Sequence, residues 1–129
     1  MKVLIANFEE TMNEFLKDLF KDLGVESFFV EQGDETLTMA KTLQPDIYLL
    51  ILNNIFFSPS IDSALNRIER AIDIVAKLKA SVGNKPIIGM SGSNAEQIES
   101  KARAAGVDYF FRLPFKVEEL EKVIEKYKN

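Results

Sequence analysis

The sequence predicts a doubly wound α/β fold, in which one parallel sheet of five strands in the order 2-1-3-4-5 carries helices on both faces. Five short apolar runs alternate along the chain with five segments of helical periodicity. The apolar runs lack polar alternation, which is typical of strands that are covered on both faces. Right-handed crossovers between such strands leave few other topologies. Because 129 residues with 47% hydrophobic content match the size and core of one domain, we expect a single domain over residues 1–129.

The first half of the chain supplies two βα units and a central strand. Residues 3–6 and 25–30 are apolar and predict strands one and two. Between them, apolar residues recur at steps of three and four from Met12 to Leu23, and Gly24 follows where a left-handed helix end is usual. Gly33 and Asp34 offer a turn and an N-cap for a second helix, which Pro45 ends. Residues 47–52 form the most apolar run and predict the third, central strand.

The second half of the chain begins with an unusually long helical pattern. Its apolar periodicity predicts a helix over residues 62–82, roughly 30 Å long at 1.5 Å per residue. Residues 86–90 predict strand four, and a helix of small residues over 95–105 ends at Gly106. Residues 107–111 predict strand five, and the spacing from Val117 to Tyr127 predicts the last helix.

Composition excludes several functional classes. The chain has no cysteine and no histidine, which removes thiolate chemistry, the commonest metal ligand and the commonest general base. A net charge of −4 and a pI near 4.9 provide no electrostatic footprint for nucleic acid. We see neither a signal peptide nor an apolar run of membrane-spanning length, so we expect a soluble, cytoplasmic protein that contacts no membrane.

Three segments carry a resemblance to a known family: PDIYLLIL, PIIGMSGS and AAGVDYFFRLPFKVEEL. They resemble the CheY-like receiver domain of bacterial two-component response regulators, and the resemblance covers essentially the whole chain. It implies a flavodoxin/CheY-like sandwich and a role in phosphorelay signal transduction. It also implies a site in which acidic residues after strand one bind Mg²⁺ and an aspartate at the end of strand three accepts phosphate. A Ser or Thr after strand four, an aromatic switch residue and a Lys–Pro pair after strand five complete that site.

The chain keeps only part of this set. By position, the family site falls on Asn7, Phe8, Ile51, Ser91, Phe110, Leu113 and Pro114. Isoleucine has no nucleophilic atom to form an acyl phosphate, and a phenyl ring offers Mg²⁺ no hard oxygen ligand. The sequence therefore predicts a degenerate pseudo-receiver that is not an enzyme, holds no metal or cofactor and works independently of phosphorylation.

We expect Phe8, Ile51 and Leu113 to lie close together and to fill part of the vacated phosphate pocket. Two other registers stay open. Moving strand three by two residues would bring Asn53 to the acceptor position, and moving strand five by one would bring Arg112 to the lysine position.

A link between the third strand and the third helix contains Ile55, Phe56 and Phe57. Adjacent phenylalanines in a loop indicate either a lid over the vacated pocket or an apolar patch for a partner. The family resemblance adds the fourth helix, fifth strand and fifth helix as a surface for a protein partner or a homodimer. The charged faces of these helices otherwise indicate solvated surface.

Two other functional classes remain as alternatives. A phosphorelay receiver with a displaced acceptor needs a carboxylate near the strand ends, yet Asp46 and Asp108 begin their strands and leave only Glu9 and Glu10 there. A flavodoxin-like domain for a small ligand or nucleotide needs a phosphate loop after strand one, where NFEETMNE instead places negative charges.

Overall fold

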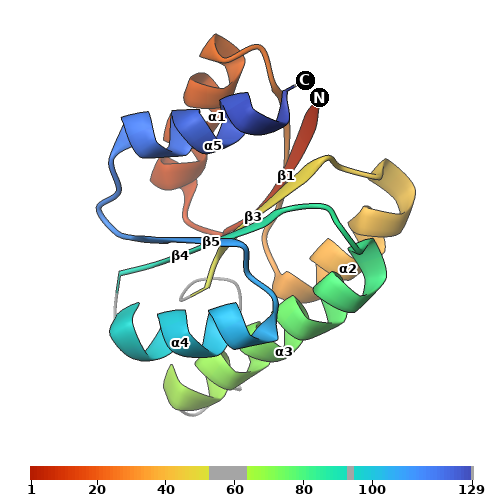
Figure 1. The fold of residues 1–129 in the computed structure, drawn as a ribbon, viewed down its shortest axis with the longest axis vertical. Coiled ribbons are helices and arrows are strands. Elements are labelled where there is room, and N and C mark those ends of the chain that lie inside the picture. Colours follow the sequence, from red (N-terminus) through yellow and green to blue (C-terminus); the bar gives the residue numbers. More distant parts are fainter. Residues whose placement is uncertain (53–63, 93–94, 129) are drawn as a thin grey trace.

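The computed structural model describes residues 1–52, 64–92 and 95–128 and contains one five-stranded parallel sheet in the order β2-β1-β3-β4-β5 (Figure 1). The strands are β1 (Lys2–Ala6), β2 (Glu26–Val30), β3 (Ile47–Ile51), β4 (Ile87–Ser91) and β5 (Tyr109–Arg112). The helices are α1 (Glu10–Asp22), α2 (Gly33–Leu43), α3 (Ala64–Val82), α4 (Ala95–Ala105) and α5 (Val117–Tyr127). The predicted fold class and strand order are confirmed.

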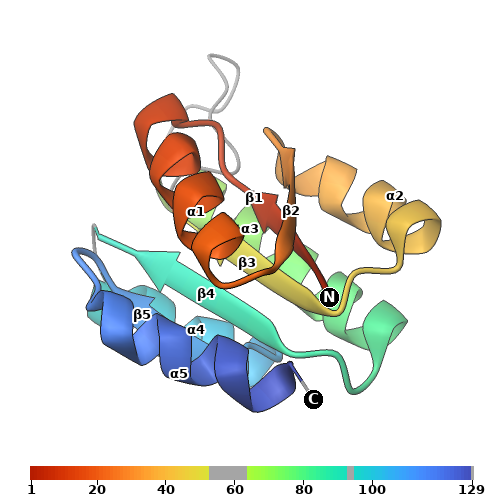
Figure 2. The ribbon, with the colours of Figure 1, turned by 90° about the horizontal axis from the view of Figure 1, so that it is seen from above.

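Helices cover both faces of the sheet. α1 and α5 lie together on one face, and α2, α3 and α4 lie on the other (Figures 1 and 2). Strand β3 illustrates why this works: Ile47, Leu49 and Ile51 belong to the apolar cluster under α1 and α5, while Tyr48 and Leu50 belong to the cluster under the other three helices. All five residues of β3 are buried, as expected for a central parallel strand. Of the helices in the described ranges, none has the length and apolar composition to cross a bilayer.

Most element ends match their sequence signals, with two corrections. The N-cap of helix α2 is Gln32 instead of Asp34, and the helix begins at Gly33. The Glu35 side chain supports this start, because it accepts a hydrogen bond from the Gln32 backbone N–H at 3.1 Å. Strand β5 begins at Tyr109 rather than at residue 107, because the Val107 N–H is used to close the end of α4 on the Ala102 carbonyl. The predicted start of the long helix at residue 62 lies outside the described residues.

Two aspartates accept hydrogen bonds from backbone N–H groups at the amino ends of neighbouring strands. Asp46 accepts a hydrogen bond from the Lys2 N–H at 2.8 Å, and Asp108 accepts one from the Ile87 N–H at 2.9 Å. Asp108 also forms an ion pair with Lys79 of α3 at 3.0 Å. Both carboxylates therefore lie at the amino edge of the sheet, as predicted from their place at the strand starts.

Candidate functional site

The carboxyl edge of the sheet brings the predicted site positions together. Ile51 at the end of β3 pairs with Met90 of β4, and Ser91 at the end of β4 pairs with Arg112 of β5. The link after β5 continues this contact, because the Leu113 N–H donates to the Ser91 carbonyl at 3.0 Å. The Leu113–Pro114 peptide bond is cis. The acceptor, hydroxyl and lysine positions of the family pattern therefore lie on neighbouring chain segments.

The side chain at the predicted acceptor position is fully buried. Ile51 has 0% exposure and belongs to the apolar cluster that also contains Met90, against which the half-buried Leu113 packs. Phe8 is half-buried. The contacts described for this cluster do not place Phe8 in it, so its share in filling the phosphate pocket stays a prediction.

An asparagine pair takes the place of acidic residues after β1. The Asn7 side chain is buried and its Nδ2 donates to the Glu9 carbonyl and to Asn13 Oδ1, both at 3.0 Å. Asn13 Nδ2 donates in return to the Asn7 carbonyl at 2.9 Å. A carboxylate could not donate either of the two Asn7 bonds, so this network selects an amide at position 7. Asn13 could not be predicted as part of this network, because its partner Asn7 lies across a turn whose geometry does not follow from sequence alone.

The Glu9 carboxylate, which follows β1, caps helix α1. Glu9 is the N-cap of α1, and its two oxygens accept hydrogen bonds from the Thr11 N–H at 3.1 Å and the Met12 N–H at 2.8 Å. Capping satisfies backbone donors at the helix start and places negative charge at the positive end of the helix dipole. Within the described ranges, no group of three or more acidic residues is placed to hold a metal ion.

The retained family positions divide between the two faces of the sheet. Ser91 is fully buried at the end of β4. Phe110 packs against the cluster under α3 and α4, whereas Tyr109 and Phe111 pack against the opposite cluster. All three rings are half-buried, and β5 is an edge strand of the sheet.

Arg112 contacts α4. Its guanidinium lies 3.3 Å from a Glu99 carboxylate oxygen and 3.7 Å from a Glu96 oxygen, and Glu99 also pairs with Arg103 at 3.0 Å. The hydrogen bond from Arg103, followed by that from Arg112, lowers the pKa of Glu99. These contacts disfavour the register in which Arg112 replaces the missing lysine.

A tyrosine pair joins β5 to α5. The hydroxyls of Tyr109 and Tyr127 lie 2.9 Å apart, and Lys126 Nζ donates to the Tyr109 oxygen at 3.1 Å. The bonds from Tyr127 and then from Lys126 lower the pKa of Tyr109, whereas the same pairing raises the pKa of Tyr127 to about 12. The geometry lets either hydroxyl donate to the other.

An apolar hollow of about 640 Å³ lies beside the site, between the first turns of α1 and the link from β5 to α5. Its walls include Met12, Leu113 and Pro114, and Phe15 stands at its rim with 46% exposure. The Phe15 and Phe115 rings meet at 6.1 Å between centroids. This surface was not predicted, because Phe15 follows the apolar periodicity of α1 and gives no sign of its exposure.

The predicted loop residues Ile55, Phe56 and Phe57 and the alternative acceptor Asn53 lie outside the described residues.

Comparison with known proteins identifies the fold. No protein-family model matches the chain. The cell cycle transcriptional regulator CtrA of Caulobacter vibrioides is 25% identical over 120 residues, which are 93% of this chain and 47% of CtrA, so the chain spans about half the length of that relative. The receiver domain of NtrX from Brucella abortus superimposes with a TM-score of 0.79 at 18% identity, over 97% of this chain and 96% of that domain. The receiver domain of the Francisella response regulator 1452 gives 0.76 at 21% identity, over 98% and 94%. The chain thus has the fold of response-regulator receiver domains, as the resemblance of its three segments implied.

Proposed function

We propose that this chain is a receiver-like signal-transduction module that works without phosphorylation and acts through protein contacts. The observation that carries the proposal is the fully buried Ile51 at the end of β3, where receivers present the phosphate acceptor. An isoleucine side chain cannot attack a phosphoryl donor, and its burial leaves the position inaccessible to one.

The surroundings of Ile51 support the loss of metal binding as well. Mg²⁺ needs several oxygen ligands in octahedral geometry. The Asn7 amide is engaged with Asn13, and the Glu9 carboxylate is engaged with the backbone of α1. Recruiting Glu9 for a metal ion would leave two helix N–H groups without their partner, at a cost of about 0.5–2 kcal/mol.

Beryllofluoride with Mg²⁺ tests this part of the proposal, because it mimics the phosphoryl group on a receiver aspartate. We expect the melting temperature of this chain to be the same with and without the mixture, while a receiver with an intact acidic site rises in parallel. A rise that saturates with beryllofluoride would reveal a bound state and contradict the proposal.

The surface of α4, β5 and α5 is the partner site that we propose. β5 is an edge strand with three half-buried rings, and Arg112 at its carboxyl end keeps 53% exposure of its side chain while it pairs with Glu96 and Glu99. Arginine and aromatic residues are enriched at protein interfaces. The Ile55, Phe56 and Phe57 loop remains a second proposed contact.

Sedimentation and affinity capture from native extract test this surface with one matched pair of variants. Arg112→Ala removes the exposed guanidinium at the proposed interface. Lys77→Ala is the control, because Lys77 is also exposed and also forms an ion pair, but on α3. We expect Arg112→Ala to weaken homodimerisation or partner capture and Lys77→Ala to leave it unchanged. Equal behaviour of both variants would exclude this surface.

A displaced acceptor and a bound nucleotide are the alternatives. Acetyl phosphate would label the chain in the first case, and the purified protein would carry nucleotide or flavin absorbance in the second. The Asn7–Asn13 network and the Glu9 cap occupy the loop after β1, where a nucleotide site would need a phosphate-binding turn. This arrangement supports neither a displaced acceptor nor a bound nucleotide.

A further inference from the structure

A second cavity lies at the amino edge of the sheet, opposite the edge where the family site falls. It is an open basin of about 620 Å³ between the end of α2, the start of β3 and the end of α3. Its polar lining consists of Lys41, Gln44, Asp46, Tyr48, Ser81 and Lys85. Ligand sites for small molecules usually fall between about 300 and 1,000 Å³.

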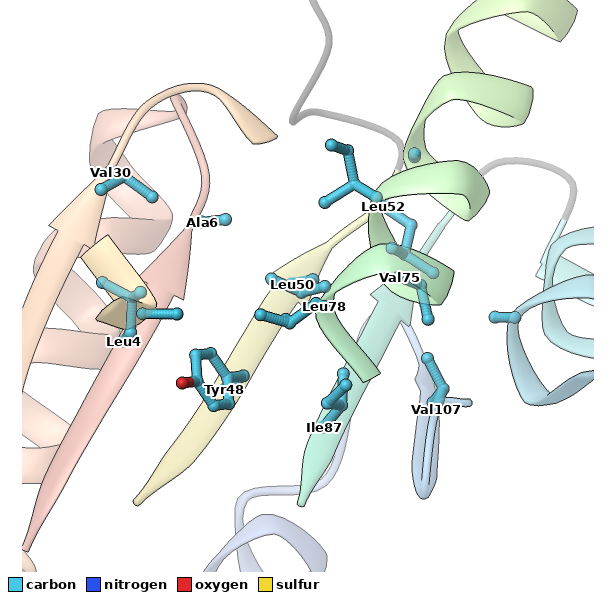
Figure 3. Packing of buried hydrophobic residues seen from close by; sticks show 14 of the residues in the cluster. Leu4, Ala6, Val30, Tyr48, Leu50, Leu52, Val75, Leu78, Ile87 and Val107 are labelled. Atoms are coloured by element: carbon cyan, nitrogen blue, oxygen red, sulfur yellow. The ribbon is translucent and has the colours of Figure 1, made fainter. Parts of the chain in front are cut away.

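Tyr48 is the unusual residue of this basin. Its side chain is 1% exposed and packs in the apolar cluster with Leu4, Leu50 and Leu78. Figure 3 shows its ring beside these residues, with the hydroxyl oxygen turned away from Ile87. The neighbouring positions of β3 are all aliphatic, so the hydroxyl is the one polar side-chain atom that this strand contributes from the core.

The Tyr48 hydroxyl opens into the basin. Among the residues that the structure describes, none forms a hydrogen bond with the Tyr48 hydroxyl. Thr36 Oγ1 is the one polar side-chain atom of the described residues that is both fully buried and without a partner, so the unpaired Tyr48 oxygen keeps some exposure, and Tyr48 lines the basin. A phenol buried to this degree normally finds a partner. Burial, followed by the charge of Asp46, raises the pKa of Tyr48, so the hydroxyl keeps its proton at neutral pH and can donate it.

The lining of the basin carries more positive than negative charge. Lys41 and Lys85 line the basin, and their only opposing charge in its lining is Asp46. One Asp46 oxygen accepts the Lys2 N–H at 2.8 Å, and the other lies 3.6 Å from Lys85 Nζ. Asp46 is therefore already engaged, and the basin keeps an excess of positive charge in a chain whose net charge is −4.

We propose that this basin binds a small organic anion. Its carboxylate or phosphate group lies between Lys41 and Lys85, and its body covers Tyr48, whose hydroxyl donates a hydrogen bond to it. Ala40, Pro45 and Val82 supply apolar wall for that body. The basin lies at the edge of the sheet away from Ile51, so this inference is independent of whether the chain can be phosphorylated.

Binding of two probes, benzoate and phenyl phosphate, followed by backbone amide chemical shifts, tests the proposal and distinguishes the two anionic groups. We expect at least one probe to saturate below about 10 mM, with shifts confined to residues 40–48 and 81–86. Benzoate alone would identify a carboxylate ligand, and phenyl phosphate alone a phosphorylated one.

Three variants locate the interaction. Tyr48→Phe keeps the packed ring and removes only the hydroxyl, and we expect roughly fivefold weaker binding. Lys41→Gln removes one charge without breaking an ion pair that the structure describes, and we expect a similar or larger loss. Lys77→Gln on α3 serves as the control and should bind like the parent. The proposal is overturned if neither probe saturates, if the shifts fall elsewhere, or if Tyr48→Phe and Lys41→Gln both bind as tightly as the parent.

Discussion

Restoring an aspartate at position 51 should damage the fold instead of restoring the chemistry. Ile51 is fully buried among apolar side chains at the end of β3. Ile51→Asp removes the burial of an isoleucine, which contributes about 1.5–3 kcal/mol, and adds a carboxylate to a site without cationic partners in the described cluster. We expect a total loss of about 3–5 kcal/mol at neutral pH.

Two controls separate the contributions to this loss. Ile51→Val keeps an apolar side chain and should cost about 0.5–1.5 kcal/mol. Asparagine has the shape of aspartate without its charge. The difference in the free energy of unfolding between Ile51→Asp and Ile51→Asn therefore reports the cost of burying the charge. Burial raises the pKa of the new aspartate above its unfolded value of about 3.9. The folded state then binds more protons than the unfolded state between these two pKa values, so the variant loses stability as the pH rises through that window.

Urea denaturation followed by circular dichroism, at about pH 5.5 and about pH 8, measures these differences. The Asp and Asn variants should lie closer together at the lower pH and diverge at the higher one. An Ile51→Asp variant as stable as Ile51→Val at the higher pH would contradict this prediction, because position 51 would then lie in an open, solvated pocket.

Three further predictions follow from single contacts. Thr36→Val should raise the free energy of unfolding by about 1 kcal/mol in urea denaturation, because it removes a buried hydroxyl that has no hydrogen-bond partner among the described residues; a loss of stability would show that this hydroxyl is bonded. In a spectrophotometric titration, Tyr109 should ionise below the ordinary tyrosine range and Tyr127 near 12. Tyr127→Phe should remove the step near 12 and move Tyr109 upward, while the raised ionisation of the buried Tyr48 stays; unchanged titration of Tyr109 would contradict the pairing. Gly106→Ala should cost at least roughly 1 kcal/mol more than Gly24→Ala, because both glycines have positive φ but only at position 106 would the new Cβ come within 2.6 Å of a lysine side chain on α3; equal melting temperatures of the two variants would contradict this.

The fold could be predicted because its signals are local. A fully apolar run such as residues 47–52 can satisfy its backbone only within a covered sheet, and Gly24 and Gly106 both take positive φ at the helix ends that they mark. The start of β5 could not be placed, since Val107 is apolar like a strand residue but uses its N–H in the turn that closes α4.

The candidate site was predictable only in part. Ile51 and Leu113 could be assigned to the carboxyl edge because strand ends follow from the strand order, and both belong to one packed region. The Asn7–Asn13 pair and the opening of Tyr48 into a basin depend on how separate segments meet in three dimensions, and neither asparagine nor tyrosine signals such a meeting by spacing. The role of Phe8 in the vacated pocket remains a prediction.

Intact-mass spectrometry of the protein after incubation with acetyl phosphate and Mg²⁺ tests the loss of phosphorylation most directly. We predict that the mass stays unchanged under conditions that label a receiver with an intact acidic site. An adduct of one phosphate, stable in acid, labile in base and located on a carboxylate near the end of β3, would contradict it.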